Sequence, residues 1–248
     1  MNGELDYHEE LYSGFAQKHF ARPAVRALRA HMVRRILRAT GAGPRARVLS
    51  LGCGIGDTEL LLAPHVGEVV GVDFSPAAIR QAREDATAAG IGNAVFVEGT
   101  YADAPPGPYD AVAAIFFLHH LPEDDLRALP DALRKLLRRG GVFYSLDPSR
   151  HRLSGAVGNL LIPKLMRKYQ SPGERELVRA ETEELFRKAG YACRSGFYDF
   201  VSSPLAGLFP GWAAGYRAAR LLDEALVRFP GLRLLGSNFE LMAANERE

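Results

Sequence analysis

A short glycine-rich stretch contains the first residues whose types and spacing could support chemistry. It runs from Gly52 to Gly56 (GCGIG), directly after the apolar run 47–51, and a helical pattern begins at Asp57. Glycines let the backbone approach a ligand closely, and the unpaired N–H groups at a helix start then face that ligand. The stretch therefore predicts a loop that binds a small polar molecule.

An acidic residue follows this loop at a spacing that suggests a nucleoside. Asp73 lies 21 positions after Gly52 and closes the second apolar run, 68–73. A carboxylate there can accept hydrogen bonds from both ribose hydroxyls of an adenosine. A plainer interpretation makes the glycines turn residues and Asp73 a helix N-terminal acid. The dinucleotide fingerprint G-x-G-x-x-G is disfavoured, because Asp57 stands at its sixth position and the glycine at the fifth.

Four segments resemble successive motifs of class I S-adenosylmethionine-dependent methyltransferases: VLSLGCGIGDTELLL, VVGVDFSPAAIRQARE, YDAVAAIFFLHHLP and LRKLLRRGGVFYSLDP. The resemblance covers about residues 45 to 150. It implies S-adenosyl-L-methionine as cofactor, with the glycine loop along its methionine part and Asp73 on its ribose. The candidate cofactor-binding residues are Ser50, Gly52, Cys53, Gly54, Gly56, Asp73, Phe74, Thr100, Tyr101, Asp103 and Phe116.

Two positions depart from the family's pattern. Ser50 stands where the family usually has Asp or Glu, so a contact toward the cofactor's amino group is weakened or rerouted through water. Where relatives commonly read Gly-Asp-Ala after the third strand, Thr100 is the aligned adenine candidate. Tyr101 could stack or give a backbone contact, and Asp103 could reach the adenine amino group or serve only as a turn residue.

Apolar runs alternate with helical patterns through most of the chain, which predicts a parallel sheet covered by helices on both faces. The predicted strands are 47–51, 68–73, 94–98, 109–118, 141–146 and 238–243, and the predicted helices are 23–39 and those starting near 57, 76, 123 and 181. The direction of the last strand cannot be read from periodicity. The resemblance implies a doubly wound, Rossmann-like α/β fold with seven strands and a final antiparallel strand.

We expect one domain over residues 1–248. Its predicted parts are an N-terminal helical cap (1–44), a cofactor-binding core (45–146) and two acceptor-site insertions (147–180 and 197–237). If the strands before the insertions are parallel members of the sheet, both insertions leave from its carboxyl edge and cover the cleft there. The alternative for these insertions is an oligomer interface, which leaves a homodimer open.

The second insertion is rich in large apolar residues, which predicts a small and largely apolar acceptor. The candidate acceptor-pocket residues are Tyr7, Tyr12, Phe117, Phe209 and Trp212. For the two N-terminal tyrosines, ordinary half-buried packing is an equal alternative.

Two adjacent histidines follow the fourth strand, at the edge where open α/β sheets bind ligands. His119 or His120 could act as a general base toward a hydroxyl or an acidic carbon. Similar HHLP sequences occur in relatives with unlike substrates, so a structural or cofactor-shielding role is favoured. Methyl transfer is an in-line displacement that depends mainly on alignment and on exclusion of water.

Composition limits the remaining classes. Lys and Arg number 31 against 29 Asp and Glu, a net charge of +2 that gives no case for a nucleic-acid partner. The spacing of the two cysteines predicts neither a disulfide nor a metal site. The acidic N-terminal stretch lacks an apolar run and predicts no secretory signal. The longest uncharged stretch, 200–216, is too short for a transmembrane helix.

We therefore expect a cytoplasmic methyltransferase, and basic residues in the first insertion leave a peripheral membrane contact open. The rival functions are an NAD-dependent oxidoreductase and a non-catalytic nucleotide-binding interaction module.

Overall fold

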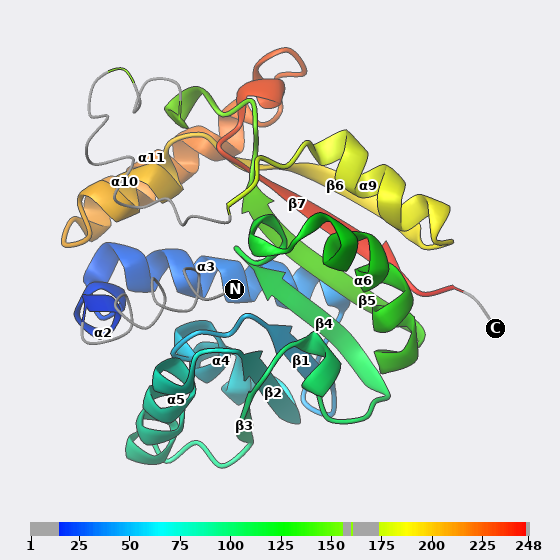
Figure 1. Ribbon diagram of the computed structural model, residues 1–248. Coiled ribbons are helices and arrows are strands. Elements are labelled where there is room, and N and C mark those ends of the chain that lie inside the picture. The colour runs from blue at the N-terminus through cyan, green and yellow to red at the C-terminus, as the bar shows by residue number, and fades with distance from the viewer. Residues whose placement is uncertain (1–14, 156–159, 161–173, 247–248) are drawn as a thin grey trace.

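The computed structural model describes residues 15–155, 160 and 174–246. Its centre is a seven-stranded sheet in the order β3-β2-β1-β4-β5-β7-β6 (Figure 1). The strands are β1 (Arg47–Leu51), β2 (Glu68–Asp73), β3 (Ala94–Glu98), β4 (Tyr109–Ile115), β5 (Leu137–Pro148), β6 (Ala192–Asp199) and β7 (Asn238–Ala244). β7 runs antiparallel to both of its neighbours, β5 and β6, while the other described strands run in one direction, which confirms the predicted fold class.

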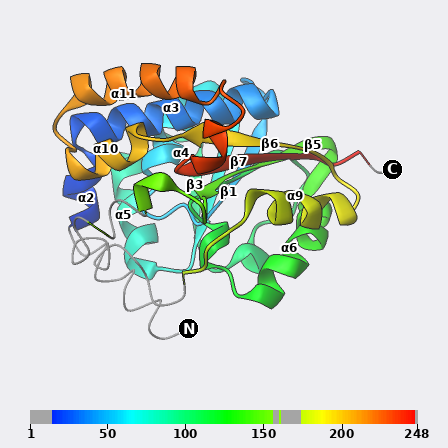
Figure 2. The same cartoon turned by 90° about the horizontal axis from the view of Figure 1, so that it is seen from above.

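Helices cover both faces of this sheet, so the central strands can be apolar on both sides. The helices are α2 (Phe15–Phe20), α3 (Pro23–Thr40), α4 (Asp57–Leu62), α5 (Pro76–Ala88), α6 (Glu123–Leu136), α9 (Arg179–Lys188), α10 (Ser202–Leu208) and α11 (Ala213–Leu226). α6 and α9 pack on one face, and α3 packs on the other with α11 against it (Figure 2). No helix among these described residues is long and apolar enough to cross a membrane.

The sequence explains where the principal helices begin and end. α3 starts with Pro23, whose fixed φ suits a first helical position, and ends at Gly41, which adopts a left-handed φ of 68°. α5 starts after Ser75, whose hydroxyl accepts a hydrogen bond from the N–H of Ala78 at 3.1 Å. These caps fix the ends of helices that flank the glycine loop.

The structure differs from the predicted elements at three strands. β4 stops at Ile115, before the predicted end at 118, because Phe116 has a positive φ. β5 is longer than the apolar run 141–146 that predicted it. β6 was not among the predicted strands, because its sequence ACRSGFYD forms a partly exposed edge without a clear apolar alternation.

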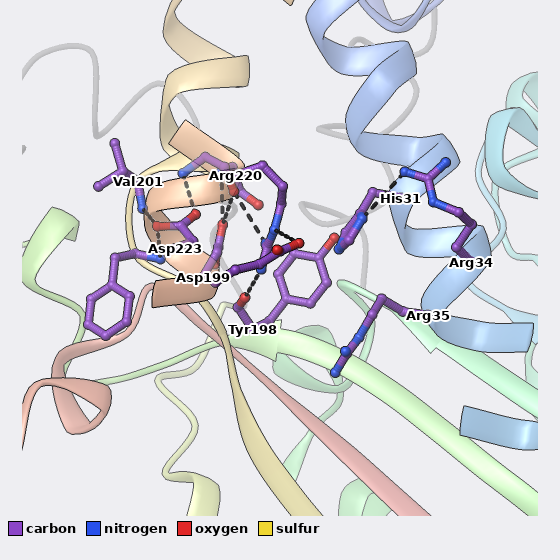
Figure 3. Close-up of polar contacts among 12 residues, drawn as sticks. His31, Arg34, Arg35, Tyr198, Asp199, Val201, Arg220 and Asp223 are labelled. Carbon is purple, nitrogen blue, oxygen red and sulfur yellow. Dashed lines mark hydrogen bonds and ion pairs between the residues drawn. The ribbon is translucent and has the colours of Figure 1, made fainter. Parts of the chain in front are cut away.

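Two buried carboxylates tie α10 and α11 to the edge of the sheet (Figure 3). Asp223 on α11 accepts hydrogen bonds of 2.9–3.0 Å from the backbone N–H groups of residues 200–202, at the start of α10. Asp199 at the end of β6 accepts hydrogen bonds from the Ser203 N–H and the Asn238 side-chain amide, both at 2.8 Å. This group, the β6–α11 joint, satisfies the first N–H groups of α10 from outside the helix.

The strand directions place the starting points of both insertions at the carboxyl edge. β5 is parallel to β4, and β6 is antiparallel to β7, which is itself antiparallel to β5. β5 and β6 therefore end at the same edge as β1, where the glycine loop begins.

Candidate active site

The glycine loop leaves β1 at the carboxyl edge and is held to the end of β2. The N–H groups of Gly52 and Cys53 both donate to the carbonyl of Val72, at 2.8 and 3.1 Å. Gly54 has a φ of 52° and Gly56 a φ of 74°, in the left-handed region that favours glycine. A Cβ at Gly56 would also lie 2.7 Å from the Phe96 ring. The turn and its close packing therefore both require glycine.

Asp73 is buried at the end of β2 and fixes the loop. Its Oδ2 accepts a hydrogen bond from the Gly54 N–H at 2.8 Å, and its Oδ1 accepts one from the Ser75 N–H at 3.0 Å. Both carboxylate oxygens are therefore held by backbone N–H groups, which fixes the orientation of the carboxylate. The contact of Asp73 with ribose hydroxyls stays a prediction.

The carboxylate of Glu59, which was not among the candidate site residues, lies beside the loop. The Ser50 hydroxyl donates a 2.6 Å hydrogen bond to Oε1 of Glu59 on α4, and both side chains are buried. Oε2 of Glu59 is buried and has no hydrogen-bond partner among the described residues. Burial raises the pKa of Glu59 to about 7, although the Ser50 hydrogen bond acts in the opposite direction. Ser50 replaces the acid that relatives usually have at this position, and Glu59 on α4 brings a carboxylate to the same place.

An ion pair joins α3 to the start of α4. The Arg29 Nε lies 2.7 Å from Oδ2 of Asp57, and both side chains are largely buried. The Arg29 guanidinium also lies 5.0 Å from the Phe20 ring centre and 6.0 Å from that of Phe116. The sequence pattern places Arg29 on the polar face of its helix, so the ion pair with Asp57 could not be predicted from that pattern.

Two phenylalanines lie where β4 ends. Phe116 has a φ of 56°, which is uncommon for a residue with a bulky side chain and often marks a functional site. Its N–H donates to the Leu146 carbonyl at 2.7 Å, so the strained residue is still held to β5. The Phe117 ring occupies the space that a Cβ of Gly52 would need, at 2.5 Å. Phe117, a candidate for the acceptor pocket, therefore packs on the glycine loop.

The adenine candidates form a small capping arrangement after β3. One carboxylate oxygen of Asp103 accepts hydrogen bonds from the Thr100 N–H at 2.8 Å and from its hydroxyl at 2.9 Å. The Thr100 hydroxyl in turn accepts from the Ala102 N–H at 3.3 Å. Tyr101 begins the short 3-10 helix that these contacts cap. The adenine contacts of all three candidates stay predictions.

The two histidines lie at the end of β4, and one of them is held by two acids. The ring of buried His119 has Nδ1 3.0 Å from Oδ1 of Asp147 and Nε2 3.3 Å from Oε1 of Glu174. Burial lowers the pKa of His119, but the hydrogen bonds to Asp147 and Glu174 outweigh it and raise the pKa to about 9. A histidine protonated at neutral pH is a poor general base, which supports the structural role. The His120 ring lies 4.0 Å from the His119 ring, between centroids.

The remaining acceptor candidates are dispersed. Tyr7 and Tyr12 lie outside the described residues. Phe209 and Trp212 lie in the turn between α10 and α11, and each keeps 57% of its surface exposed. The Pro210 carbonyl in this turn accepts a hydrogen bond from the Ala24 N–H at 2.8 Å, which places the turn beside the start of α3.

Comparison with known proteins identifies the core. Residues 48–141 match the family model described as a methyltransferase domain. An uncharacterised methyltransferase of Synechocystis, sll0829, is 27% identical over 150 residues, which cover 60% of this chain and 68% of that protein. The uncharacterised methyltransferase YcgJ of Bacillus subtilis is 32% identical over 104 residues, which cover 41% of this chain and only 40% of YcgJ.

Solved structures share the fold at low identity. The YcgJ structure superposes with a TM-score of 0.59 at 20% identity and covers 88% of this chain and 99% of that one. The magnesium protoporphyrin IX methyltransferase ChlM of Synechocystis, solved with bound SAH, gives a TM-score of 0.61 at 19% identity over 97% of this chain and 93% of that one. Residues 48–141 therefore match a methyltransferase domain, and the chain has the class I fold of S-adenosylmethionine-dependent methyltransferases.

Proposed function

We propose that the chain transfers a methyl group from S-adenosylmethionine to a small, largely apolar acceptor at the carboxyl edge of the sheet, beneath α10 and α11. One hydrophobic cluster carries this proposal, because it joins the ends of β4 and β5 to both helices. Its members at this edge include Ile115, Phe116, Leu146, Leu205, Ala206 and Tyr216. Apolar side chains of the second insertion thus reach the strand ends next to the glycine loop.

Two acidic side chains are assigned to the cofactor. Asp73 would hold the ribose, because its buried carboxylate lies at the end of β2 and is fixed against the backbone of the glycine loop. When ionised, Glu59 would supply, through its pair with Ser50, the negative charge that the family usually places at position 50. When bound, S-adenosylmethionine supplies a methyl group activated by a sulfonium.

The chain's own contribution to the reaction is alignment and exclusion of water. Both ring nitrogens of His119 face carboxylates, so His119 is assigned no proton transfer. The Phe117 ring packs on Gly52 just after β4 and would shield the loop from solvent. Fixing the acceptor against the methyl carbon in a dry site accounts for a large part of the rate of such displacements.

The cofactor half of the proposal is tested by thermal unfolding. S-adenosylhomocysteine should raise the melting temperature of the full chain, since a ligand that binds only the folded state stabilises it, whereas NADH should have no effect. Stabilisation by NADH alone would favour an oxidoreductase. No stabilisation by either ligand would favour a non-catalytic module.

The acceptor half is tested by screening small molecules with labelled S-adenosylmethionine, and then by variants. With an acceptor in hand, Phe209→Ala and Trp212→Ala should each raise its KM roughly tenfold, from the loss of about 1.5 kcal/mol of apolar contact. Val95→Ala, a similarly exposed apolar side chain on the distant edge strand β3, serves as the matched control. If the two variants change only the oligomeric state seen by light scattering, the segment is an interface and the apolar acceptor is refuted.

A further inference from the structure

We propose that His119, His120 and Glu174 form a binding site for one divalent cation of the zinc class, beside the ends of β4 and β5. Each of the three residues offers one ligand atom, and these atoms all lie within 4.8 Å of one another. Two histidines and one carboxylate are a ligand set that zinc and neighbouring first-row metals prefer. The cysteine spacing predicts no metal site, but it carries no information about histidine and carboxylate ligands.

The separation between two of these ligands already matches a bound metal. The His119 Nε2 and Glu174 Oε1 lie 3.3 Å apart. Two ligands at about 2.0–2.1 Å from a tetrahedral zinc are themselves separated by roughly 3.3 Å. His120 and Glu174 are both partly exposed, so their side chains can adjust around an ion without rearranging the core.

A carboxylate behind His119 orients it as a metal ligand. Oδ1 of Asp147 lies 3.0 Å from the His119 Nδ1 and 3.3 Å from its backbone N–H, from which it accepts a hydrogen bond. A histidine that donates its Nδ1–H to an acid presents Nε2 to the metal, which is the usual arrangement behind zinc-bound histidines. Asp147 is fully buried, and its Oδ2 has no hydrogen-bond partner among the described residues. A dication bound at Nε2 would displace the proton that His119 otherwise carries, and the charges of Asp147 and Glu174 would balance the ion.

The backbone around Glu174 is fixed relative to His119. The N–H of Arg175 donates to the His119 carbonyl at 2.8 Å, and the Arg175 guanidinium pairs with Glu123 at 2.5 Å. Two residues later, Leu177 forms a parallel bridge with Ser149, just after β5. The segment that carries Glu174 is thus anchored to the sheet, as a preformed metal site requires.

Three protein ligands leave one position of a tetrahedral ion open. The cluster follows the carboxyl end of β4, so an oxygen or nitrogen donor of the acceptor could occupy that position. This last step rests on the proposed function, whereas metal binding itself does not.

The test uses untagged, metal-free full chain, without cofactor or acceptor, so its outcome is independent of methyl transfer. Zn²⁺ titrated in a calorimeter should bind at one ion per chain with micromolar or lower Kd. His120→Gln and Glu174→Gln should each weaken binding at least tenfold, and Asp147→Asn should weaken it by about 10- to 100-fold while all three ligands remain. Co²⁺ should give visible absorption bands that the same variants abolish.

Two exposed residues give matched controls. His65→Gln and Glu176→Gln replace the same residue types outside the cluster and should bind Zn²⁺ as the parent does. Circular dichroism would verify that each variant is folded, and His120→Gln and Glu174→Gln change side chains that are not fully buried. Absence of stoichiometric Zn²⁺ binding by the parent, or equal affinity in the ligand variants and controls, would overturn the proposal.

Discussion

Replacing Glu59 by glutamine should make the protein's stability less dependent on pH. The pKa of Glu59 is raised from 4.5 to about 7 in the folded protein, chiefly by burial. The folded state therefore holds the proton more tightly than the unfolded state. The stability contributed by this proton is fully present below about pH 4.5 and is lost as pH rises through about 7. Glutamine keeps the shape of the side chain and does not ionise.

The size of the effect follows from the two pKa values. Their difference is 7 − 4.5, or about 2.5 units, and each unit corresponds to about 1.36 kcal/mol. The full effect is thus about 3 kcal/mol, of which about 2.5 kcal/mol falls between pH 5 and 8.5. The free energy of unfolding of Glu59→Gln, relative to the parent, should rise by that amount over this range.

Urea unfolding followed by circular dichroism, at steps of half a pH unit, would measure the difference. Glu84→Gln, at an exposed position on α5, is the matched control and should show no trend relative to the parent. A constant difference between Glu59→Gln and the parent from pH 5 to 8.5 would refute the reasoning. It would mean that Glu59 is ionised in the folded protein throughout that range.

Three further substitutions test the loop, the ribose contact and the joint. Gly54→Val should abolish S-adenosylhomocysteine binding in calorimetry, because the φ of 52° at this position is unfavourable for valine and the loop would change shape. The variant should stay folded, and normal binding by it would mean that the loop is not part of the site. Asp73→Ala should weaken that binding by about 1.5 to 3 kcal/mol, and an unchanged Kd in a folded variant would exclude the ribose contact. Asp223→Ala should lower the free energy of unfolding by about 2 to 4 kcal/mol, because three backbone N–H groups lose their acceptor. A change below about 0.5 kcal/mol in urea unfolding would mean that the joint contributes little.

Most of the sheet could be predicted because its strands are buried on both faces. The runs that became β1, β2 and β4 are continuous and apolar, and their order along the chain predicts parallel neighbours. β6 lies at the sheet edge and mixes Arg, Ser and Gly with apolar residues, so no local pattern marks it. The direction of β7 depends on pairing with β5 and β6, which no local property of its sequence records.

The candidate site also has a part that local motifs predict and a part that depends on long-range contacts. The glycine loop and Asp73 belong to local motifs, and the structure brings them together at 2.8 Å. The contact between Glu59 and Ser50 could have been predicted, because the two residues are nine positions apart and belong to one strand–loop–helix unit. The contact of Glu174 with His119 joins residues 55 positions apart, and neither residue's neighbours indicate the other. Contacts between polar side chains that are distant in the sequence therefore could not be predicted.

The β6–α11 joint also bears on how this chain could change during evolution. The Asp223 carboxylate binds residues 200–202 through their backbone N–H groups alone. Every amino acid except proline carries this donor. Substitutions of Phe200 or Val201 by residues other than proline would leave these three hydrogen bonds in place, whereas Ser202 is buried and its hydroxyl contacts Asp199. The exposed tip around Phe209 and Trp212 could then acquire new side chains, and with them new ligand preferences, while its attachment to the sheet persists.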